Sequence, residues 1–165
     1  MKDRILVPVD GSEYALHALD TAADLGRATG ATIIVCHVVD IAKASMMSFG
    51  EAQLVAACFD ALHQEGEGIV RDAVQHLRDR LGNDASIESR IAQGNTVEEI
   101  TRIAAEMHAT WIVMGSHGRT GLVRMLMGSI AEGVLRHSPV PIVIVPVRHV
   151  HRRTATEHAV VAAES

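Results

Sequence analysis

The sequence predicts an α/β domain, a Rossmann-like fold built around an open parallel β-sheet of five strands. Short runs rich in Val and Ile alternate along the chain with longer stretches whose apolar residues recur every three or four positions. Five such runs alternating with four helical stretches are typical of a parallel sheet, and right-handed crossovers place helices on both of its faces. The 165 residues suffice for one domain with a substantial core.

Turn residues mark the first strand and the first helix. Residues 5–9 read Ile-Leu-Val-Pro-Val, a β-rich run that stops at Asp10. Residues 13–29 have helical spacing, with Ser12 as the expected N-cap and Gly30 as the expected residue after the last turn. The chain therefore begins with a strand that leads directly into a helix.

The next segment is less regular. Residues 32–39 form a continuous apolar run that predicts the second strand. Residues 40–50 show no period, and we expect them to be irregular. Residues 51–81 predict one long helix, although Gly66 and Gly68 lie inside it and weaken the case for an unbroken helix.

The third and fourth strands flank another helix. Residues 86–92 alternate loosely between apolar and polar side chains, which indicates a strand with one wetter face. Residues 96–107 predict a helix opened by a capping box that runs from Thr96 to Glu99. Residues 111–114 are the fourth strand, which ends at a glycine.

The last helix and strand close the predicted domain. Residues 129–137 predict a helix in which Ser129 opens a second capping box. Residues 140–145 are the fifth strand, and its prolines indicate an edge position. Because this edge is too apolar to stay exposed, we expect it to form a homodimer contact. Residues 1–147 are then the domain, and residues 148–165 are expected to be a mobile tail.

Composition excludes several classes of protein. The net charge is −5 and aromatic residues make up only 2% of the chain, which argues against binding to duplex or single-stranded nucleic acid. Two cysteines cannot form a disulfide framework and fit a reducing compartment. Because the sequence shows no signal peptide and no run of about 18 apolar residues, we expect a cytoplasmic protein without membrane contact.

Ligands of such sheets bind outside the carboxyl ends of the strands, so the residues that follow each strand are the candidates. The segment 115–121 after the fourth strand has three glycines, which allow close approach of backbone N–H groups to an anion. Arg119 adds a guanidinium suited to phosphate, and Gly128 and Ser129 open a helix whose N-terminus favours an anion. Together these features predict a polyphosphate site that is neither a Walker A loop nor a dinucleotide fingerprint.

Each candidate also has a purely structural interpretation. Asp10 could simply cap the helix that follows it, and Ser129 could be a helix cap that also touches phosphate. His117 is a potential acid or base, but no Ser or Cys nucleophile is arranged around it in the sequence, so no residue is assigned a catalytic role. His149 and His151 lack a third ligand nearby, and the ligands of any metal stay unassigned.

The spacing Gly115-x2-Gly118-x9-Gly128-Ser129 resembles the nucleotide signature of the universal stress protein family. Other segments also resemble that family in the right order: Ile5 to Ser12, His37-Val38, Met114 to Gly118, and Pro139 to Val145. The resemblance covers residues 2–147, and several motifs in the same order make it stronger than any one of them.

The resemblance implies the strand order 3-2-1-4-5, homodimers that pair through the last strand, and binding of ATP, ADP or AMP with Mg²⁺. It places Asp10 near the ribose or a phosphate-bound metal, and the backbone of Val38 near the adenine. The glycines and Ser129 of the signature should hold the phosphates, with His117 and Arg119 alongside. The expected nucleotide-binding residues are Pro8, Val9, Asp10, Val38, Met114, Gly115, His117, Gly118, Arg119, Gly128, Ser129 and Ile130.

Three functions are compatible with this sequence. The favoured one is an ATP-binding stress-response or signalling module that turns ATP over slowly or not at all and acts through a homodimer. The second is an ATPase or another ATP-using enzyme on the same fold. The third is a dimerisation scaffold that binds no ligand. The sequence does not identify a protein partner for any of these three functions.

Overall fold

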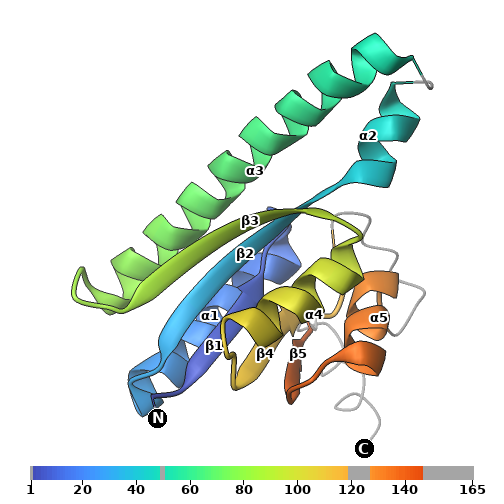
Figure 1. Ribbon diagram of the computed structural model, residues 1–165. Coiled ribbons are helices and arrows are strands. Elements are labelled where there is room, and N and C mark those ends of the chain that lie inside the picture. The colour runs from blue at the N-terminus through green and yellow to red at the C-terminus, as the bar shows by residue number, and fades with distance from the viewer. Residues whose placement is uncertain (1, 49–50, 119–126, 147–165) are drawn as a thin grey trace, which may run out of the picture.

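The computed structural model describes residues 2–48, 51–118 and 127–146, and its strands form one parallel sheet (Figure 1). The strand order is β3-β2-β1-β4-β5, and all four pairings are parallel, as predicted. The elements are β1 (Arg4–Pro8), α1 (Glu13–Thr29), β2 (Thr32–Asp40), α2 (Ile41–Met47), α3 (Ala52–Leu81), β3 (Ile87–Gly94), α4 (Thr96–Glu106), β4 (Trp111–Gly115), α5 (Ser129–His137) and β5 (Ile142–Val145).

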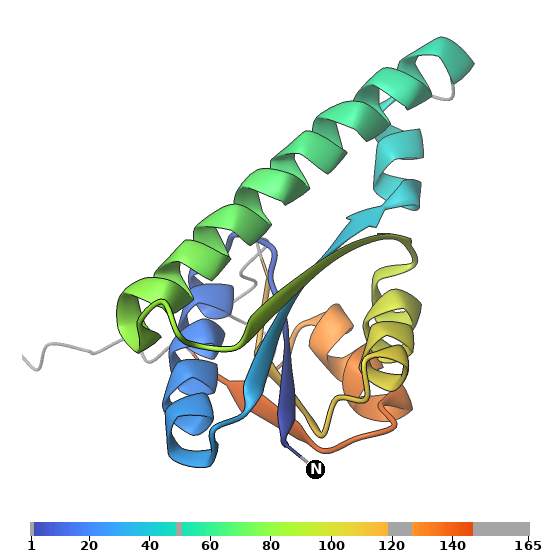
Figure 2. The same ribbon diagram turned by 60° about the vertical axis from the view of Figure 1, so that its left-hand side comes forward.

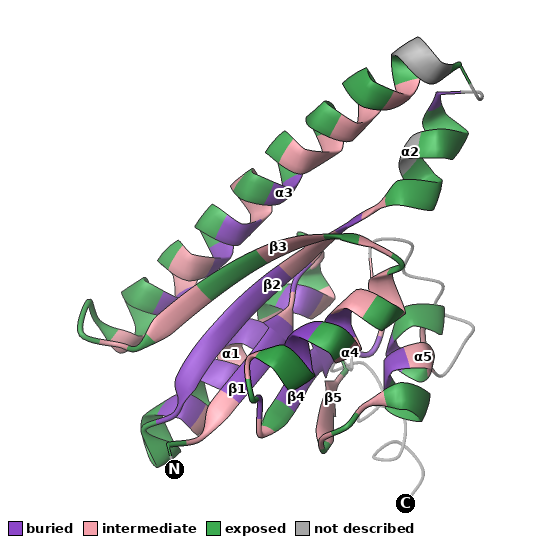
Figure 3. Cartoon of the chain, in the orientation of Figure 1, coloured by how far each residue is buried: buried purple, intermediate pink, exposed green. Residues whose placement is uncertain are grey.

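Helices cover both faces of the sheet because successive strand side chains point to opposite sides. On one face, Ile5 and Val7 pack with α1 and with the C-terminal half of α3. On the other face, Leu6 and Ile34 pack with α4 and α5. The inner strands β1, β2 and β4 are accordingly mostly buried (Figure 3).

The helix ends confirm some of the sequence predictions and correct others. Ser12 caps α1 by accepting a hydrogen bond from the Ala15 N–H at 3.2 Å, and Gly30 ends α1 with a φ of 69°. The predicted cap of α4 is wrong by one residue, because Asn95 accepts from the N–H groups of the second and third helical residues. The capping box predicted at Ser129 is also wrong: Gly128 holds the N-cap position of α5 without any side-chain cap.

The segment 41–47 is helical, not irregular as the sequence suggested. The reason is Asp40, whose Oδ1 atom accepts hydrogen bonds from the N–H groups of Ala42 and Lys43 at 2.9 and 3.3 Å. The helix α3 runs unbroken through both of its glycines. Its N-terminal part extends beyond the sheet beside α2, whereas its C-terminal part packs on the sheet (Figure 2).

The strand β5 lies at the edge of the sheet, as its prolines predicted. Its side chains serve both cores of its own domain: Val143 and Val145 pack on the α1 side, and Ile142 and Ile144 pack on the α4 side. The predicted tail, residues 148–165, lies outside the described residues. In the part of the chain that the structure describes, no helix combines the length and apolar character that a membrane span requires.

Candidate functional site

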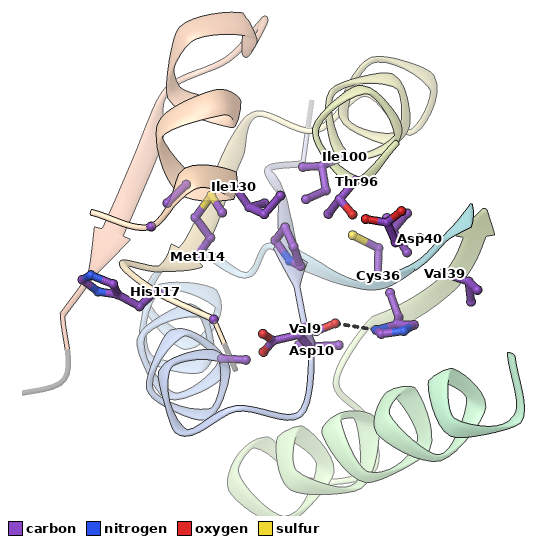
Figure 4. A pocket seen from close by; sticks show the side chains of 18 of the residues that line it. Val9, Asp10, Cys36, Val39, Asp40, Thr96, Ile100, Met114, His117 and Ile130 are labelled. Carbon is purple, nitrogen blue, oxygen red and sulfur yellow. Dashed lines mark hydrogen bonds between the residues drawn. The ribbon is translucent and has the colours of Figure 1, made fainter. Parts of the chain in front are cut away.

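A cavity of about 350 Å³ opens at the carboxyl ends of the central strands (Figure 4). It lies between the ends of β1, β2 and β4 and is closed by the first turns of α4 and α5. The chain crosses from one side of the sheet to the other at β1, which has β2 and β4 as its neighbours. The cavity therefore occupies the topological switch point at which open α/β sheets bind ligands.

The predicted binding residues come together at this cavity. Those that line it are Pro8, Val9, Asp10, Val38, Met114, Gly115, His117, Gly118, Gly128, Ser129 and Ile130. Arg119, the remaining predicted residue, lies outside the described residues. Residues from four separate segments of the chain, three strand ends and one helix start, thus lie around one space.

Asp10 supports the helix cap and also faces the cavity. Its Oδ1 atom accepts hydrogen bonds from the N–H and the hydroxyl of Ser12 at 3.0 and 2.6 Å. Ser12, in turn, is the residue that caps α1. Asp10 therefore supports the cap of α1 through Ser12 and is not itself the N-cap. Its other carboxylate oxygen, Oδ2, lies beside Gly118.

The signature glycines are needed for close packing, not for unusual backbone angles. None of Gly115, Gly118 and Gly128 is among the positive-φ glycines. A Cβ atom at Gly115 would lie 2.6 Å from the Tyr14 Cβ, so this glycine lets α1 approach β4. A Cβ atom at Gly128 would lie 3.3 Å from the His117 Cα. These glycines allow the end of β4 and the start of α5 to pack closely against their neighbours.

The N-terminus of α5 presents hydrogen-bond donors to the cavity. The first intrahelical bond runs from the Glu132 N–H to the Gly128 carbonyl at 2.9 Å. The N–H groups of the three residues between them, Ser129, Ile130 and Ala131, make no hydrogen bond within the described residues, and all three residues line the cavity. Unpaired N–H groups at a helix N-terminus form a site for an anion.

The edge of β2 presents both a donor and an acceptor. The Cys36 carbonyl accepts from the Val9 N–H at 2.8 Å, so the backbone of Cys36 faces β1. Because backbone groups alternate in direction along a strand, Val38 faces the same side, beyond the last residue of β1. Its N–H and C=O point to the space where the cavity begins, and Val38 lines that cavity.

His117 is held by its neighbours. Its Nδ1 atom lies 3.1 Å from the Ser116 hydroxyl, and its ring packs against Tyr14 with centroids 5.3 Å apart. The sequence did not predict this contact between His117 and the Ser116 hydroxyl. Ser116 is nevertheless buried and is not part of the cavity lining, so this pair does not present a nucleophile to a ligand.

A buried thiol and the carboxylates of Asp10, Asp40 and Glu65 complete the chemistry of the cavity. Cys36 lies at the wall of the cavity, and its burial raises the pKa of its thiol to about 12, which keeps the sulfur protonated and unreactive. Within the described residues, no group of three His, Cys, Asp or Glu side chains gathers to hold a metal ion. Any divalent ion here would rely on one or two carboxylates of this lining, such as that of Asp10, together with oxygens of its ligand.

Comparison with known proteins now adds the family. Residues 1–146 match the model of the universal stress protein family. The chain belongs to this family. Universal stress protein MJ0531 of Methanocaldococcus jannaschii is 29% identical over 143 residues, which cover 86% of this chain and 81% of that protein.

Solved structures of universal stress proteins share the fold. The structure of MJ0577, from the same organism, has a TM-score of 0.77 at 28% identity and covers 90% of this chain and 98% of its own. A universal stress protein in complex with cAMP has a TM-score of 0.62 at 24% identity, with 88% and 97% coverage. A universal stress protein from Archaeoglobus fulgidus in complex with dAMP has a TM-score of 0.61 at 20% identity, with 87% and 97% coverage. At these lower identities the likeness of the two complexes concerns the fold alone.

The cavity also includes residues that were not among the predicted nucleotide-binding residues. They are Ala15, Cys36, His37, Val39, Asp40, Lys43, Leu62, Glu65, Thr96, Ile100 and Ala131. Asp40 ends β2 and Thr96 lies two residues after the end of β3, so the carboxyl-end rule alone could have found them. Lys43, Leu62 and Glu65 belong to α2 and α3, and no local sequence pattern indicates that these helices reach the cavity.

Proposed function

We propose that this universal stress protein binds an adenine nucleotide in the cavity at the carboxyl ends of β1 and β4. The observation that carries the proposal is that two unlike binding surfaces open into the same cavity. The N-terminus of α5 supplies donors for an anion, and the edge of β2 at Val38 supplies a donor and an acceptor for a base. A nucleotide combines these two chemistries in one molecule.

The phosphates belong at the α5 end of the cavity. The N–H groups of Ser129 and Ile130, which have no partner among the described residues, stabilise negative charge there together with the positive end of the helix dipole. Gly118 and Gly128 leave room for phosphate oxygens to come close to the backbone. His117 and Arg119 are the side chains assigned to the same group.

The base and the ribose belong at the β1 and β2 end. Met114 and Ile100 line the cavity and supply apolar surface for a flat ring, while the backbone of Val38 reads its polar edge. Asp10 is assigned to the ribose hydroxyls or to a divalent ion on the phosphates. Its carboxylate fits either role, because Mg²⁺ takes one or two carboxylates together with phosphate oxygens, and such an ion would neutralise phosphate charge.

The proposed role is that of a stress-response module in which the nucleotide biases a conformational or dimer equilibrium. Such coupling is reciprocal, so a partner that prefers the bound form also raises nucleotide affinity. We assign the homodimer contact to β5, which lies at the sheet edge with mostly Val and Ile side chains. The cytoplasm is the proposed location, and the two free cysteines fit its reducing conditions.

Calorimetric titration of ATP, ADP and AMP, each with and without Mg²⁺, tests the function. Saturable binding with slow or no turnover is the expected result. Rapid product release that depends on a co-substrate would instead indicate an ATP-using enzyme. Absence of binding at millimolar concentrations of all three nucleotides would overturn the proposal and leave a ligand-free scaffold.

A further inference from the structure

The end of the ladder between β1 and β2 lacks a bond that a regular parallel sheet would contain. The Val9 N–H donates to the Cys36 carbonyl at 2.8 Å, which is the bond expected at this register. In a continuing parallel ladder, the carbonyl of the same residue would accept from the N–H two positions further along the neighbour. That donor is the Val38 N–H, and no such bond occurs within the described residues.

The Val9 carbonyl is occupied by a side chain instead. The His37 Nδ1 atom lies 2.7 Å from the Val9 oxygen, the contact drawn as a dashed line beside Val9 in Figure 4. Because a carbonyl only accepts hydrogen bonds, the Nδ1 atom must carry the proton and donate it. The imidazole thus satisfies the acceptor that would otherwise pair with Val38.

The position of this imidazole is fixed by α3. A Cβ atom at Gly66 would lie 2.6 Å from the His37 Cδ2 atom and 3.1 Å from its Nε2 atom, so glycine is required for the ring to fit. Gly66 is itself buried inside an unbroken helix, where glycine is unfavourable relative to alanine. Gly66 thus leaves the space in which the His37 ring lies against the end of β1.

We infer that His37 is a positioning residue for nucleotide recognition: by taking the Val9 carbonyl, it keeps the Val38 N–H unpaired and available to the base. The effect on base recognition rests on the proposed function, whereas the effect of His37 on the Val38 N–H does not. Without the imidazole donor, the ladder would close by one more bond and withdraw the Val38 N–H from the cavity. The specificity of the site then depends on a side chain that contacts backbone and helix, and need not touch the base.

Two variants distinguish the effect of the His37 hydrogen-bond donor from the effect of its ring. His37→Phe keeps an aromatic ring without a donor, and His37→Asn places an amide nitrogen at the same number of bonds from the backbone as Nδ1. We measure amide hydrogen exchange at Val38 without any nucleotide. His37→Phe should slow the exchange about tenfold or more, because the N–H gains the Val9 carbonyl, whereas the parent and His37→Asn should exchange alike.

Nucleotide affinity gives the second readout. His37→Phe should weaken AMP binding about tenfold but leave ribose 5-phosphate binding unchanged, because only AMP uses the Val38 N–H. His37→Asn should restore AMP affinity. Equal weakening of AMP and ribose 5-phosphate in His37→Phe, or failure of His37→Asn to rescue, would make the role of His37 merely structural and overturn the inference.

The two proposals fail separately. A parent that binds no nucleotide overturns the proposed function, while the exchange of the Val38 amide still decides whether His37 controls that N–H. Exchange that is identical in the parent and in folded His37→Phe overturns the inference even if the parent binds AMP tightly. Thermal melting of each variant establishes that it is folded.

Discussion

A Cβ atom at Gly118 would lie 2.7 Å from the Asp10 Oδ2 atom, so the loop after β4 and the end of β1 meet directly. These residues are far apart in the sequence and come together only because β1 and β4 are neighbours in the sheet. Because Asp10 also supports the N-cap of α1 through Ser12, this contact links the cavity wall to the adjacent helix.

Gly118→Val should abolish or weaken ATP binding by at least about tenfold while the fold is kept. The reason is spatial, since Gly118 does not have a positive φ: a branched side chain would push against the Asp10 carboxylate and fill the cavity. Calorimetry measures the binding. As a control, Gly68→Ala meets only the tip of Arg71 at 3.6 Å and should leave binding unchanged. A folded Gly118→Val variant with parental affinity would contradict the phosphate assignment.

Asp10→Ala should weaken ATP binding, or its dependence on Mg²⁺, far more than it lowers stability. The lost hydrogen bonds to Ser12 should cost about 1 kcal/mol of unfolding free energy. The matched control is Ser12→Ala, which removes the cap of α1 but leaves the Asp10 carboxylate. Ser12→Ala should therefore cost similar stability at unchanged ATP affinity. If melting of Asp10→Ala falls sharply at constant affinity, Asp10 is only a structural residue.

Most of the fold could be predicted because local patterns were strong. The apolar runs located the five strands, and Ser12 and Gly30 fixed the ends of α1. The helix α2 was missed because a short helix has no useful periodicity, and its start depends on the Asp40 carboxylate. The cap of α4 was misplaced because Asn95 and Thr96 are both good capping residues, and only the backbone shows which one is extended.

Site residues could be predicted from the sequence where they follow a strand or begin a helix. Those contributed by the middle of a helix that packs near the strand ends could not. The chemistry at Asp10, Gly118 and Ser129 comes from strand ends and a helix start, which sequence patterns reveal. The contribution of Glu65 depends on how far α3 extends over the sheet, and that distance is set by tertiary packing. The link between His37 and Gly66 is likewise visible only as a contact, because the residues belong to different elements.

Cys36 should resist alkylation in the folded protein. Burial raises the pKa of its thiol from 9.0 to about 12, so the reactive thiolate stays scarce as the pH rises from 7 to 9. The unfolded thiol does ionise near pH 9, so the stabilising contribution of this group decreases as the pH rises from about 9 toward 12. Iodoacetamide at pH 8.5 with peptide mapping should label the half-buried Cys58 first. Labelling of Cys36 at the same rate in native buffer would contradict this prediction.

The proposed homodimer predicts a specific pattern of protected amides on β5. The Val145 carbonyl accepts from the Ser116 N–H, so the backbone of Val145 faces β4, and that of Ile144 faces the open edge. In a dimer paired through this edge, the Ile144 amide should gain exchange protection as protein concentration rises, while the Val145 amide stays constant.

Sedimentation at micromolar concentration provides the companion measurement for this dimer. No side chain of β5 offers a clean charge substitution for this test, because residues such as Val143 pack into the core of their own domain. Sedimentation as a monomer across the micromolar range, with the Ile144 amide unprotected throughout, would refute pairing through β5.

The most direct test of the nucleotide assignment is an amide chemical-shift titration of the parent protein with AMP and ATP. If the base lies at β2 and the phosphates lie at α5, the amides of Val38, Ser129 and Ile130 should shift most, and ATP should shift the two α5 amides more than AMP does. The amides on the far ends of the strands, such as that of Thr32, should stay in place. Saturable shifts confined to a different surface, or no shifts at millimolar nucleotide, would contradict the account.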